Sequence, residues 1–210
     1  MDGLTAQYLS SLLKTDDAMH RLKDRMQEKE IPVVTDEALK LIEVLMQSSK
    51  VRSVLEIGTA VGVSSMFFAS FMGESGRVTT IERDDHSYMQ ALKNIENLCF
   101  NDQIEVLHGD ATELLAQLTD SYDMVFLDGA KAHYIHMLDD CIRLLKVGGI
   151  LIADNVLFRG MVSGEAPLRR RKITIVKRMR LFLEEISRRN DLTTSILPIG
   201  DGVSISVRIK

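Results

Sequence analysis

The sequence predicts a doubly wound α/β fold in which a mostly parallel sheet lies between layers of helices. First, short apolar runs rich in β-branched residues alternate with segments of helical periodicity from Arg52 onward, a pattern typical of βαβ units. Second, residues 192–209 alternate apolar and polar side chains on both sides of a Pro-Ile-Gly-Asp-Gly turn, which predicts an antiparallel hairpin. Five parallel strands and this hairpin give a seven-stranded, Rossmann-like sheet.

The expected elements follow in chain order. Residues 4–48 predict three helices, because Pro32 interrupts the helical pattern and Thr35 or Asp36 can cap the next helix. The expected parallel strands are Ser53–Ile57, Arg77–Ile81, Ile104–His108, Met124–Leu127 and Ile150–Ala153. The helices expected between them are Ser64–Met72, His86–Leu98, Thr112–Gln117 and Tyr134–Leu145, and the hairpin strands are Leu192–Leu197 and Val203–Ile209. We expect one domain over residues 1–210, with residues 1–49 as a helical extension.

Composition excludes several classes of protein. The chain has 210 residues, of which 45% are hydrophobic and 27% are charged, a balance typical of a protein with a full core. Its longest apolar run, Met66–Met72, is far shorter than the roughly 18 residues of a membrane span. Cys99 and Cys141 form neither a disulfide framework nor a metal-ligand pattern. We therefore expect a soluble cytoplasmic protein that is not secreted and has no membrane segment.

Charge is distributed unevenly along the chain. The net charge of −4 combines +7 between Arg159 and Asn190 with −11 elsewhere. The basic residues of this segment are Arg159, Arg169, Arg170, Arg171, Lys172, Lys177, Arg178, Arg180, Arg188 and Arg189. A local field of one sign attracts partners of the opposite charge, although a solvated helix face would carry the same pattern.

The loop after the first expected strand has the features of a nucleoside site. Gly58 and Gly62 allow the backbone to turn sharply and to approach a ligand. Ala60 stands where a dinucleotide fingerprint needs its second glycine, which favours a nucleoside ligand without a pyrophosphate. Glu82 ends the second strand, where a carboxylate can accept ribose hydroxyl protons. This combination makes S-adenosylmethionine (SAM) the leading ligand, although a tight strand-to-helix turn alone would also need the glycines.

Two further strand ends carry acidic residues. Asp128 follows the fourth expected strand, and Asp154 and Asn155 follow the fifth. Two carboxylates and an amide oxygen are hard ligands suited to Mg²⁺, whereas a single Asp at a strand end is more often a cap or turn residue. Lys131 follows three residues after Asp128. Its side chain there could take a proton from a reacting oxygen or stabilise its charge, whereas without the neighbouring carboxylates it would be an ordinary surface lysine. Asp110, after the third strand, would lie beside an adenine or would cap the next helix.

The segments VLEIGTAVGVSS, TTIER, FLDGAK and ADNV resemble those of the cation-dependent O-methyltransferases, which include catechol and caffeoyl-CoA O-methyltransferases. The resemblance covers residues 33–210 and implies the class I methyltransferase fold, a homodimer, and Asp128, Asp154 and Asn155 as metal ligands. It implies Lys131 beside the reacting oxygen and Val34 over the cofactor. The other residues that it places around SAM are Glu56, Gly58, Ser64, Glu82, Asp110, Ala111 and Asp128.

The C-terminal third of the chain resembles a narrower group within this family. DNVLFRGMV, the basic helix and ILPIGDGVSIS resemble the bacterial tRNA 5-hydroxyuridine methyltransferases, which form 5-methoxyuridine at the wobble position of the anticodon. This resemblance implies tRNA as the partner, with Arg159 at the target nucleotide and Arg169, Arg170, Arg171 and Lys172 along the phosphates. Gly129 stands where catechol enzymes carry a histidine, so catechol-specific contacts do not transfer.

Three alternatives remain open at this level. A small-molecule O-methyltransferase acting on catechols or phenols would share every motif before Val156, and only the basic segment favours RNA. A module that binds SAM without catalysis would not need Asp128, Asp154, Asn155 and Lys131 together. A nicotinamide-dependent oxidoreductase is disfavoured by Ala60.

Overall fold

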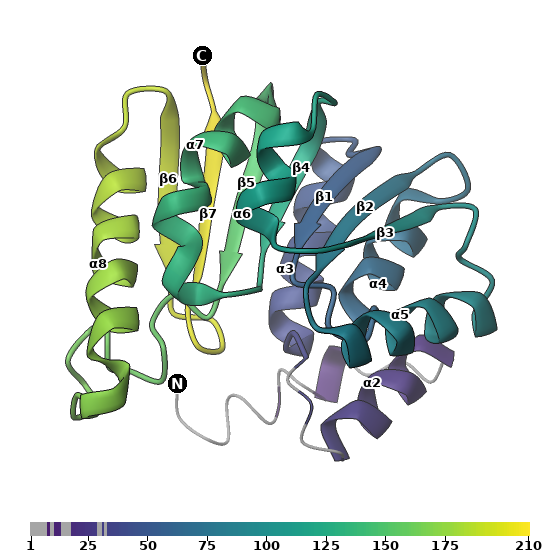
Figure 1. The fold of residues 1–210 in the computed structure, drawn as a ribbon, viewed down its shortest axis with the longest axis horizontal. Helices are drawn as coiled ribbons and strands as arrows, with labels where there is room; N and C mark the ends of the chain where they lie inside the picture. Colours follow the sequence, from purple (N-terminus) through teal and green to yellow (C-terminus); the bar gives the residue numbers. More distant parts are fainter. Residues whose placement is uncertain (1–7, 9–10, 14–17, 29–30, 32) are drawn as a thin grey trace.

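The computed structural model describes residues 8, 11–13, 18–28, 31 and 33–210. Its centre is a seven-stranded sheet with the strand order β3-β2-β1-β4-β5-β7-β6 (Figure 1). Strands β1 to β5 are parallel, and β7 is antiparallel to both β5 and β6. The predicted class I methyltransferase arrangement is therefore confirmed. The strands are β1 (Ser53–Ile57), β2 (Arg77–Glu82), β3 (Ile104–His108), β4 (Tyr122–Leu127), β5 (Leu145–Asp154), β6 (Leu192–Leu197) and β7 (Val203–Arg208).

Helices cover both faces of this sheet. One face is covered by α2 (Ala18–Glu28), α3 (Asp36–Ser48), α4 (Val63–Met72) and α5 (Asp85–Asn97). The other carries α7 (Tyr134–Leu144) and α8 (Ile173–Arg188), together with the short α6 (Ala111–Leu114) and its continuation η1 (Leu115–Gln117). Two further 3₁₀ turns, η2 (Lys131–His133) and η3 (Arg170–Lys172), precede α7 and α8.

The central strands are apolar on both sides because each side faces a helical layer. Side chains alternate along a strand, so Met124 and Phe126 of β4 pack with the α2–α5 layer. Val125 and Leu127 of the same strand pack with the α7–α8 layer. All four are fully buried, and the strand ends beside them are held in fixed register, which positions the residues that follow each strand.

Several boundaries differ from the sequence expectation. Strand β5 begins at Leu145 rather than Ile150, because Leu145 pairs with Tyr122 across a register shift in β4. Lys146 and two glycines in this stretch have low strand propensity. The hydrophobic pattern of the sequence therefore did not predict the first half of β5. The helix expected over Thr112–Gln117 is instead α6 followed by the 3₁₀ turn η1.

The N-terminal region is attached through α2 and α3. Thr35 caps α3, because its Oγ1 accepts the N–H of Ala38 at 3.3 Å. The buried Lys23 of α2 forms an ion pair with Asp36 at the start of α3. Tyr8 and residues 11–13 are helical, whereas the rest of the first predicted helix and Pro32 lie outside the described residues. Within the described part of the chain, no helix is both long and apolar enough to cross a membrane.

Candidate active site

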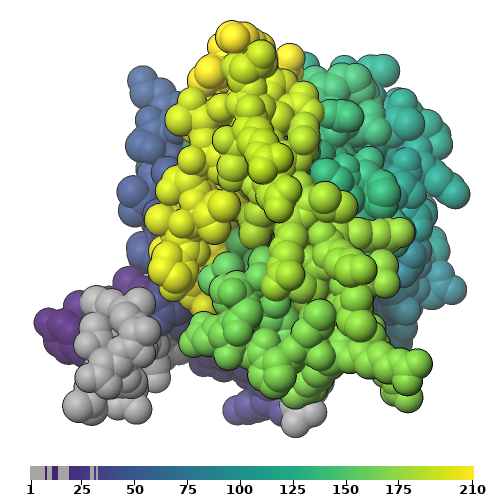
Figure 2. Space-filling model, turned by 90° about the vertical axis from the view of Figure 1, so that its left-hand side faces the viewer, coloured from purple at the N-terminus to yellow at the C-terminus, as the bar shows by residue number. Residues whose placement is uncertain are grey.

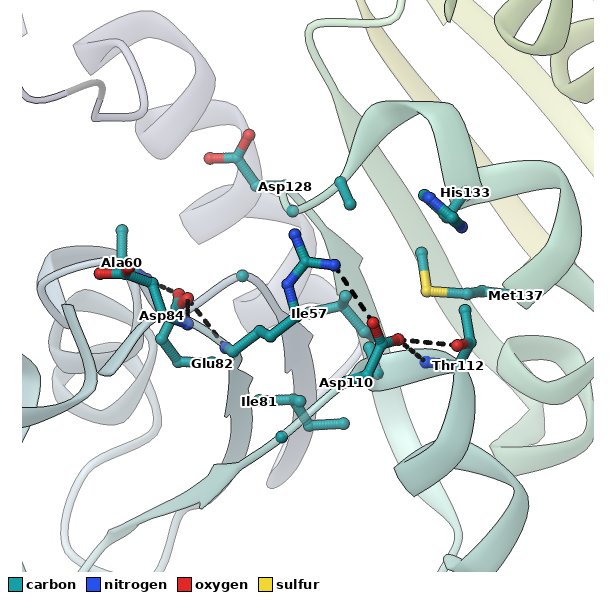
Figure 3. A pocket seen from close by; sticks show the side chains of 16 residues that line it. Ile57, Ala60, Ile81, Glu82, Asp84, Asp110, Thr112, Asp128, His133 and Met137 are labelled. Atoms are coloured by element: carbon teal, nitrogen blue, oxygen red, sulfur yellow. Dashed lines mark hydrogen bonds and ion pairs between the residues drawn. The ribbon is translucent and has the colours of Figure 1, made fainter. Parts of the chain in front are cut away.

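The main cavity lies at the carboxyl ends of β1 to β4, where an open α/β sheet places its ligand. Its volume is about 370 Å³, and Figure 3 shows the residues around it. Five predicted cofactor residues line it, namely Gly58, Glu82, Asp110, Ala111 and Asp128. The other lining residues are Ile57, Ala60, Ile81, Arg83, Asp84, Gly109, Thr112, Gly129, Ala130, His133 and Met137.

Gly58 brings the loop after β1 into backbone contact with the loop after β4. Its φ is +102°, and a Cβ atom there would lie 2.6 Å from both the Cα and the N of Gly129. A Cβ on Gly129 would in turn lie 3.1 Å from the carbonyl oxygen of Ile57. The two loops that border the cavity can therefore approach this closely only with glycine at position 58.

We expect Gly58→Ala to lower the free energy of unfolding by roughly 2–4 kcal/mol, since a strained φ and a backbone clash add together. Urea unfolding measures this change. Gly73→Ala is the matched control, because Gly73 also has a positive φ of 71° but a Cβ atom there would have no neighbour within 4 Å. Equal losses for the two variants would show that the contact with Gly129 does not matter.

Glu82, at the end of β2, is held by the backbone around it. Its Oε2 accepts the N–H of Ala60 at 2.8 Å, and its Oε1 accepts the N–H groups of Arg83 at 2.9 Å and Asp84 at 2.8 Å. Three of the roughly four acceptor positions of a carboxylate are thus filled. The side chain is fixed at the cavity wall, with one position on the Oε2 side left for a ligand hydroxyl.

Asp110 lines the opposite side of the cavity and also caps α6. Its Oδ1 accepts the N–H of Thr112 at 2.9 Å and the Thr112 hydroxyl at 2.7 Å, and these bonds lower the pKa of the carboxyl group. Its Oδ2 lies 3.2 Å from the guanidinium of Arg83. Figure 3 shows Glu82 with Ala60 on one side of the cavity and Asp110 with Thr112 on the other. Asp110 therefore caps α6 and also lines the cavity.

Glu56, a predicted cofactor residue, does not line the main cavity. It is fully buried in β1, and its carboxylate accepts the hydroxyls of Ser64, Ser65 and Thr80. Burial raises its pKa to about 7, although these hydroxyls oppose the shift. Glu56 therefore joins β1 to the start of α4 and to β2. Ser64 and the buried Val34, the remaining predicted cofactor residues, line a smaller adjoining cavity of about 20 Å³ that also reaches Asp128.

The raised pKa of Glu56 predicts a pH-dependent stability. The folded protein keeps a proton on Glu56 up to about pH 7, whereas the unfolded chain releases it near the ordinary value of 4.5. The free energy of unfolding is therefore expected to fall as pH rises from 5 to 8, relative to the non-titrating Glu56→Gln variant. Urea unfolding in chelator at both pH values tests this. The exposed Glu96 gives the control variant Glu96→Gln, and a pH-independent difference for Glu56→Gln would contradict the assignment.

Asp128 and Asp154 lie at the ends of adjacent strands. Leu127 pairs with Ala153, so the next residue of each strand reaches the same edge of the sheet. Asp154 is only 5% exposed, and burial together with the negative charge of Asp128 raises its pKa to about 7. Burial also raises the pKa of Asp128, against the attraction of Lys131, whose Nζ lies 3.2 Å from Asp128 Oδ1. The structure thus brings these three predicted residues together.

The donor set at this edge fits a divalent cation. The buried carboxylate of Asp154 and the partly buried carboxylate of Asp128 repel each other, so a positive charge between them stabilises both. Lys131 balances only one negative charge. Asn155 follows Asp154 with a left-handed φ of 54°, and its N–H donates to Asp154 Oδ1 at 2.7 Å. In the described part of the chain, no three His, Cys, Asp or Glu side chains are grouped as a metal site, so the third protein donor here would be an amide oxygen. Carboxylate and amide oxygens suit Mg²⁺.

Seven of the ten basic residues of the C-terminal segment form two groups in the structure. Arg178, Arg180 and Arg189 are engaged within the fold, with the carbonyls of Ala132 and Val162 and with Asp139 and Asp191, respectively. The second group, which we call the basic cluster, consists of the exposed residues Arg169, Arg170, Arg171 and Lys172.

The basic cluster lies immediately before α8, in the green segment of Figure 2 next to that helix. Positive charge at a helix N-terminus opposes the helix dipole, and the first turn of α8 has no acidic residue to compensate it. The basic cluster therefore does not stabilise α8. Arg159, the fifth predicted substrate residue, is also exposed and lies in the loop that follows Asn155.

Four residues near the site had no role in the sequence interpretation. Arg83, His133 and Met137 line the main cavity, and only the position of Arg83 directly after Glu82 signalled its place. Asp201, in the turn between β6 and β7, accepts the N–H of Arg159 and lies close enough to Asp154 to raise its pKa. The Gly-Asp-Gly sequence around it indicated a turn but not its contact with the loop that follows β5.

Comparisons with known proteins agree with this geometry. A family model described as O-methyltransferase matches residues 6–209. The catechol O-methyltransferase of Niastella koreensis is 31% identical over 165 residues, which cover 75% of each chain. A crystal structure from Staphylococcus aureus, provisionally named a caffeoyl-CoA O-methyltransferase, is 35% identical with a TM-score of 0.92 and coverage of 98% of this chain and 99% of that one.

A second solved structure was determined with a bound ligand. It is an O-methyltransferase from Streptomyces achromogenes in complex with SAM, which is 26% identical with a TM-score of 0.83, and the match covers 97% of this chain and 95% of that one. The family model spans nearly the whole sequence, and the fold agrees with both solved structures. The chain therefore belongs to the O-methyltransferase family.

Proposed function

We propose that this protein transfers the methyl group of SAM to the 5-hydroxyl of 5-hydroxyuridine in a tRNA anticodon loop, with the help of a divalent cation. The observation that carries the proposal is the placement of Asp128 between two features. On one side lies the cavity with Glu82 and Asp110. On the other side lie Asp154, Asn155 and the exposed Arg159 that follows them.

The cavity residues have the chemistry to bind SAM. Glu82 would accept a ribose hydroxyl at Oε2. Asp110 and Ala111 would lie beside the adenine, and Ile81 and Met137 give the same cavity apolar side chains. The SAM complex of the Streptomyces relative supports this ligand. When bound, SAM supplies a methyl group on a positively charged sulfur. The fixed carboxylate of Glu82 contributes by orienting that group before the acceptor arrives.

Asp128, Asp154, Asn155 and Lys131 act on the acceptor. A divalent cation held by the first three would lower the pKa of the acceptor hydroxyl and orient the neighbouring carbonyl oxygen. Lys131 donates a hydrogen bond to Asp128 Oδ1 at 3.2 Å. From that position its ammonium group stabilises negative charge on the acceptor oxygen. Holding the oxygen and the methyl carbon near each other and in line supplies most of the acceleration.

The basic cluster supports RNA as the partner. Its four exposed cations have no acidic partner in the first turn of α8, and phosphate contacts of this kind position a nucleic acid without reading its sequence. A wobble nucleotide lies in a loop, so presenting its base costs less than extracting one from a duplex.

We expect the double variant Arg170→Ala/Arg171→Ala to bind tRNA at least about tenfold more weakly and with a salt dependence reduced by roughly one unit of log–log slope. Filter binding between 50 and 200 mM salt measures both quantities. The charge-matched control is Lys93→Ala/Arg188→Ala, which removes two exposed cations elsewhere. SAM affinity should not change in either variant. Equal effects of the two double variants on tRNA binding would argue against a role of the cluster.

A small-molecule acceptor is the second candidate, because a catechol O-methyltransferase is among the relatives. A catechol has two neighbouring oxygens, as 5-hydroxyuridine does, so the Asp128–Asp154 edge suits both. Incubation of the purified protein with SAM and either tRNA containing 5-hydroxyuridine or catechol, followed by mass analysis of the products, separates them. Formation of 5-methoxyuridine with only slow catechol methylation supports the tRNA proposal, and the reverse result overturns it.

We also infer that residues 1–210 act as one domain and assemble as a homodimer. The apolar side chains of Leu12 and Val44 are 62% and 58% exposed and lie in one shallow groove with Leu41, which is typical of an interaction surface. Sedimentation velocity of the purified chain tests the dimer, and a single monomeric species at micromolar concentration would contradict it.

A further inference from the structure

The loop that follows β5 has an unusual backbone. We call residues 155–162 the rim loop. Asn155, Phe158 and Arg159 have left-handed φ values of 54°, 47° and 56°. Residues with a Cβ atom rarely adopt this conformation, because the side chain approaches the carbonyl oxygen. Three such residues within one short loop persist only where surrounding contacts determine the conformation.

The turn between β6 and β7 supplies these contacts at the start of the rim loop. Gly202 O accepts the N–H of Val156 at 2.9 Å, and Asp201 O accepts the N–H of Leu157 at 2.9 Å. The carboxylate of Asp201 accepts the N–H of Arg159 through Oδ1. Gly202 packs so closely that a Cβ there would lie 2.4 Å from Leu157 Cγ.

The other side of the turn and the end of the rim loop are also fixed. Gly200 lies against Thr35, the cap of α3, where a Cβ atom would be 3.3 Å from Thr35 Cγ2. At the end of the loop, Arg180 of α8 donates to the carbonyl oxygen of Val162 at 3.0 Å. Between these supports, Lys172 of the basic cluster lies 5.8 Å from the centre of the Phe158 ring.

Among the contacts of the rim loop described above, one comes from a side chain to the backbone of Arg159. The backbone N–H of Arg159 donates to Asp201 Oδ1, and no other side-chain acceptor for it occurs among the described residues. The φ value of a residue sets the direction of its Cβ, so the bond that holds Arg159 in the left-handed region also sets where its exposed side chain begins. Arg159 lies between the Asp154–Asn155 edge and the basic cluster along the chain.

We propose that Asp201 is a positioning residue for the acceptor substrate. By accepting the N–H of Arg159, it holds Arg159 in the left-handed conformation and directs the guanidinium to a phosphate next to the target nucleotide. This inference rests on the proposed function for the identity of the substrate. The hydrogen bond and its effect on the rim loop belong to the protein alone.

Two substitutions of Asp201 separate the hydrogen bond from the charge. Asp201→Ala removes both, whereas Asp201→Asn removes the charge and keeps an oxygen that accepts the N–H of Arg159. In the protein alone, we expect Asp201→Ala to increase amide hydrogen exchange of residues 157–160 at least tenfold, and Asp201→Asn to restore most of the protection. Unchanged exchange in Asp201→Ala would overturn the proposal.

Steady-state kinetics then tests the role in binding, with an anticodon stem-loop RNA that contains 5-hydroxyuridine as the acceptor. Asp201→Ala should raise the KM for this RNA about tenfold, change kcat less than threefold and leave SAM affinity unchanged, and Asp201→Asn should recover most of the KM. In an Arg159→Ala background, Asp201→Ala should have no further effect on KM, since Asp201 acts through Arg159.

The outcomes distinguish this proposal from the proposed function. Faster exchange of residues 157–160 with an unchanged KM overturns the positioning role and leaves the tRNA activity intact. An equal KM increase in the wild-type and Arg159→Ala backgrounds also overturns it. Absence of methyl transfer to the RNA by the wild-type protein refutes the proposed function, and the positioning of Arg159 for that substrate fails with it, whereas the exchange result still reports on the loop.

Discussion

Asp154→Ala is expected to reduce methyl transfer at least about 1000-fold. The loss follows from the removal of one of the two carboxylates at the candidate cation site. A bound cation contributes several kcal/mol, and about 1.4 kcal/mol corresponds to a factor of ten in rate. SAM affinity should change less than threefold, since Asp154 does not line the main cavity. Single-turnover methyl transfer and calorimetric titration with SAM measure the two effects.

The folded state of this variant should not be weakened. Burial and the charge of Asp128 both disfavour the ionised form of Asp154, so its replacement removes a repulsion in the protein without metal. The Tm in chelator is therefore expected to stay the same or to rise. Asp120→Ala, at an exposed loop position, controls for the loss of one negative charge. Methyl transfer by the Asp154→Ala protein in excess chelator would disprove the role of the cation.

Glu82→Ala is expected to weaken SAM binding roughly 100-fold. The variant loses a hydrogen bond from a ribose hydroxyl to a charged acceptor, an interaction of about 1.5–3 kcal/mol. It also leaves the N–H groups of Ala60, Arg83 and Asp84 without the acceptor they now share, which loosens the loop that borders the cavity. Calorimetric titration with SAM gives the change in Kd.

The effect of Glu82→Ala should depend on the ligand. Adenine alone, which lacks the ribose, should lose much less affinity than SAM, since only the ribose contacts Glu82. Glu96→Ala removes an exposed acid on α5 and should leave both affinities unchanged. Equal losses for adenine and SAM would indicate that Glu82 only supports the loop and does not contact the ribose.

The succession of strands and helices along the chain followed from local patterns. Met124–Leu127 is apolar without interruption because both faces of β4 are covered, and this run was visible in the sequence. The first half of β5 was not, because only Leu145 of this half pairs with β4, across a register shift. Such pairing depends on a neighbouring strand rather than on the segment itself.

The distinction between Glu56 and Glu82 required the tertiary structure. Both are acidic residues of neighbouring parallel strands, and the family resemblance placed both beside SAM. Thr80 lies opposite Glu56 in the register of β1 and β2, and together with two serines of α4 it encloses the carboxylate. Glu82 lies beyond this pair at the strand end and reaches the cavity. The register between strands, which no local pattern encodes, decided which acid faces the ligand.

By itself, the sequence determined the element order, the carboxyl-end location of the site and the residue types available there, because hydrophobic periodicity and glycine positions are local properties. Only the tertiary structure decided which cations bind carbonyls or acids within the fold. Arg178, Arg180 and Arg189 bind carbonyls and acids from distant segments, whereas Arg169–Lys172 stay exposed. It also showed that Asp201 reaches Arg159, since contacts between residues far apart in the chain form only when the strands and loops pack together.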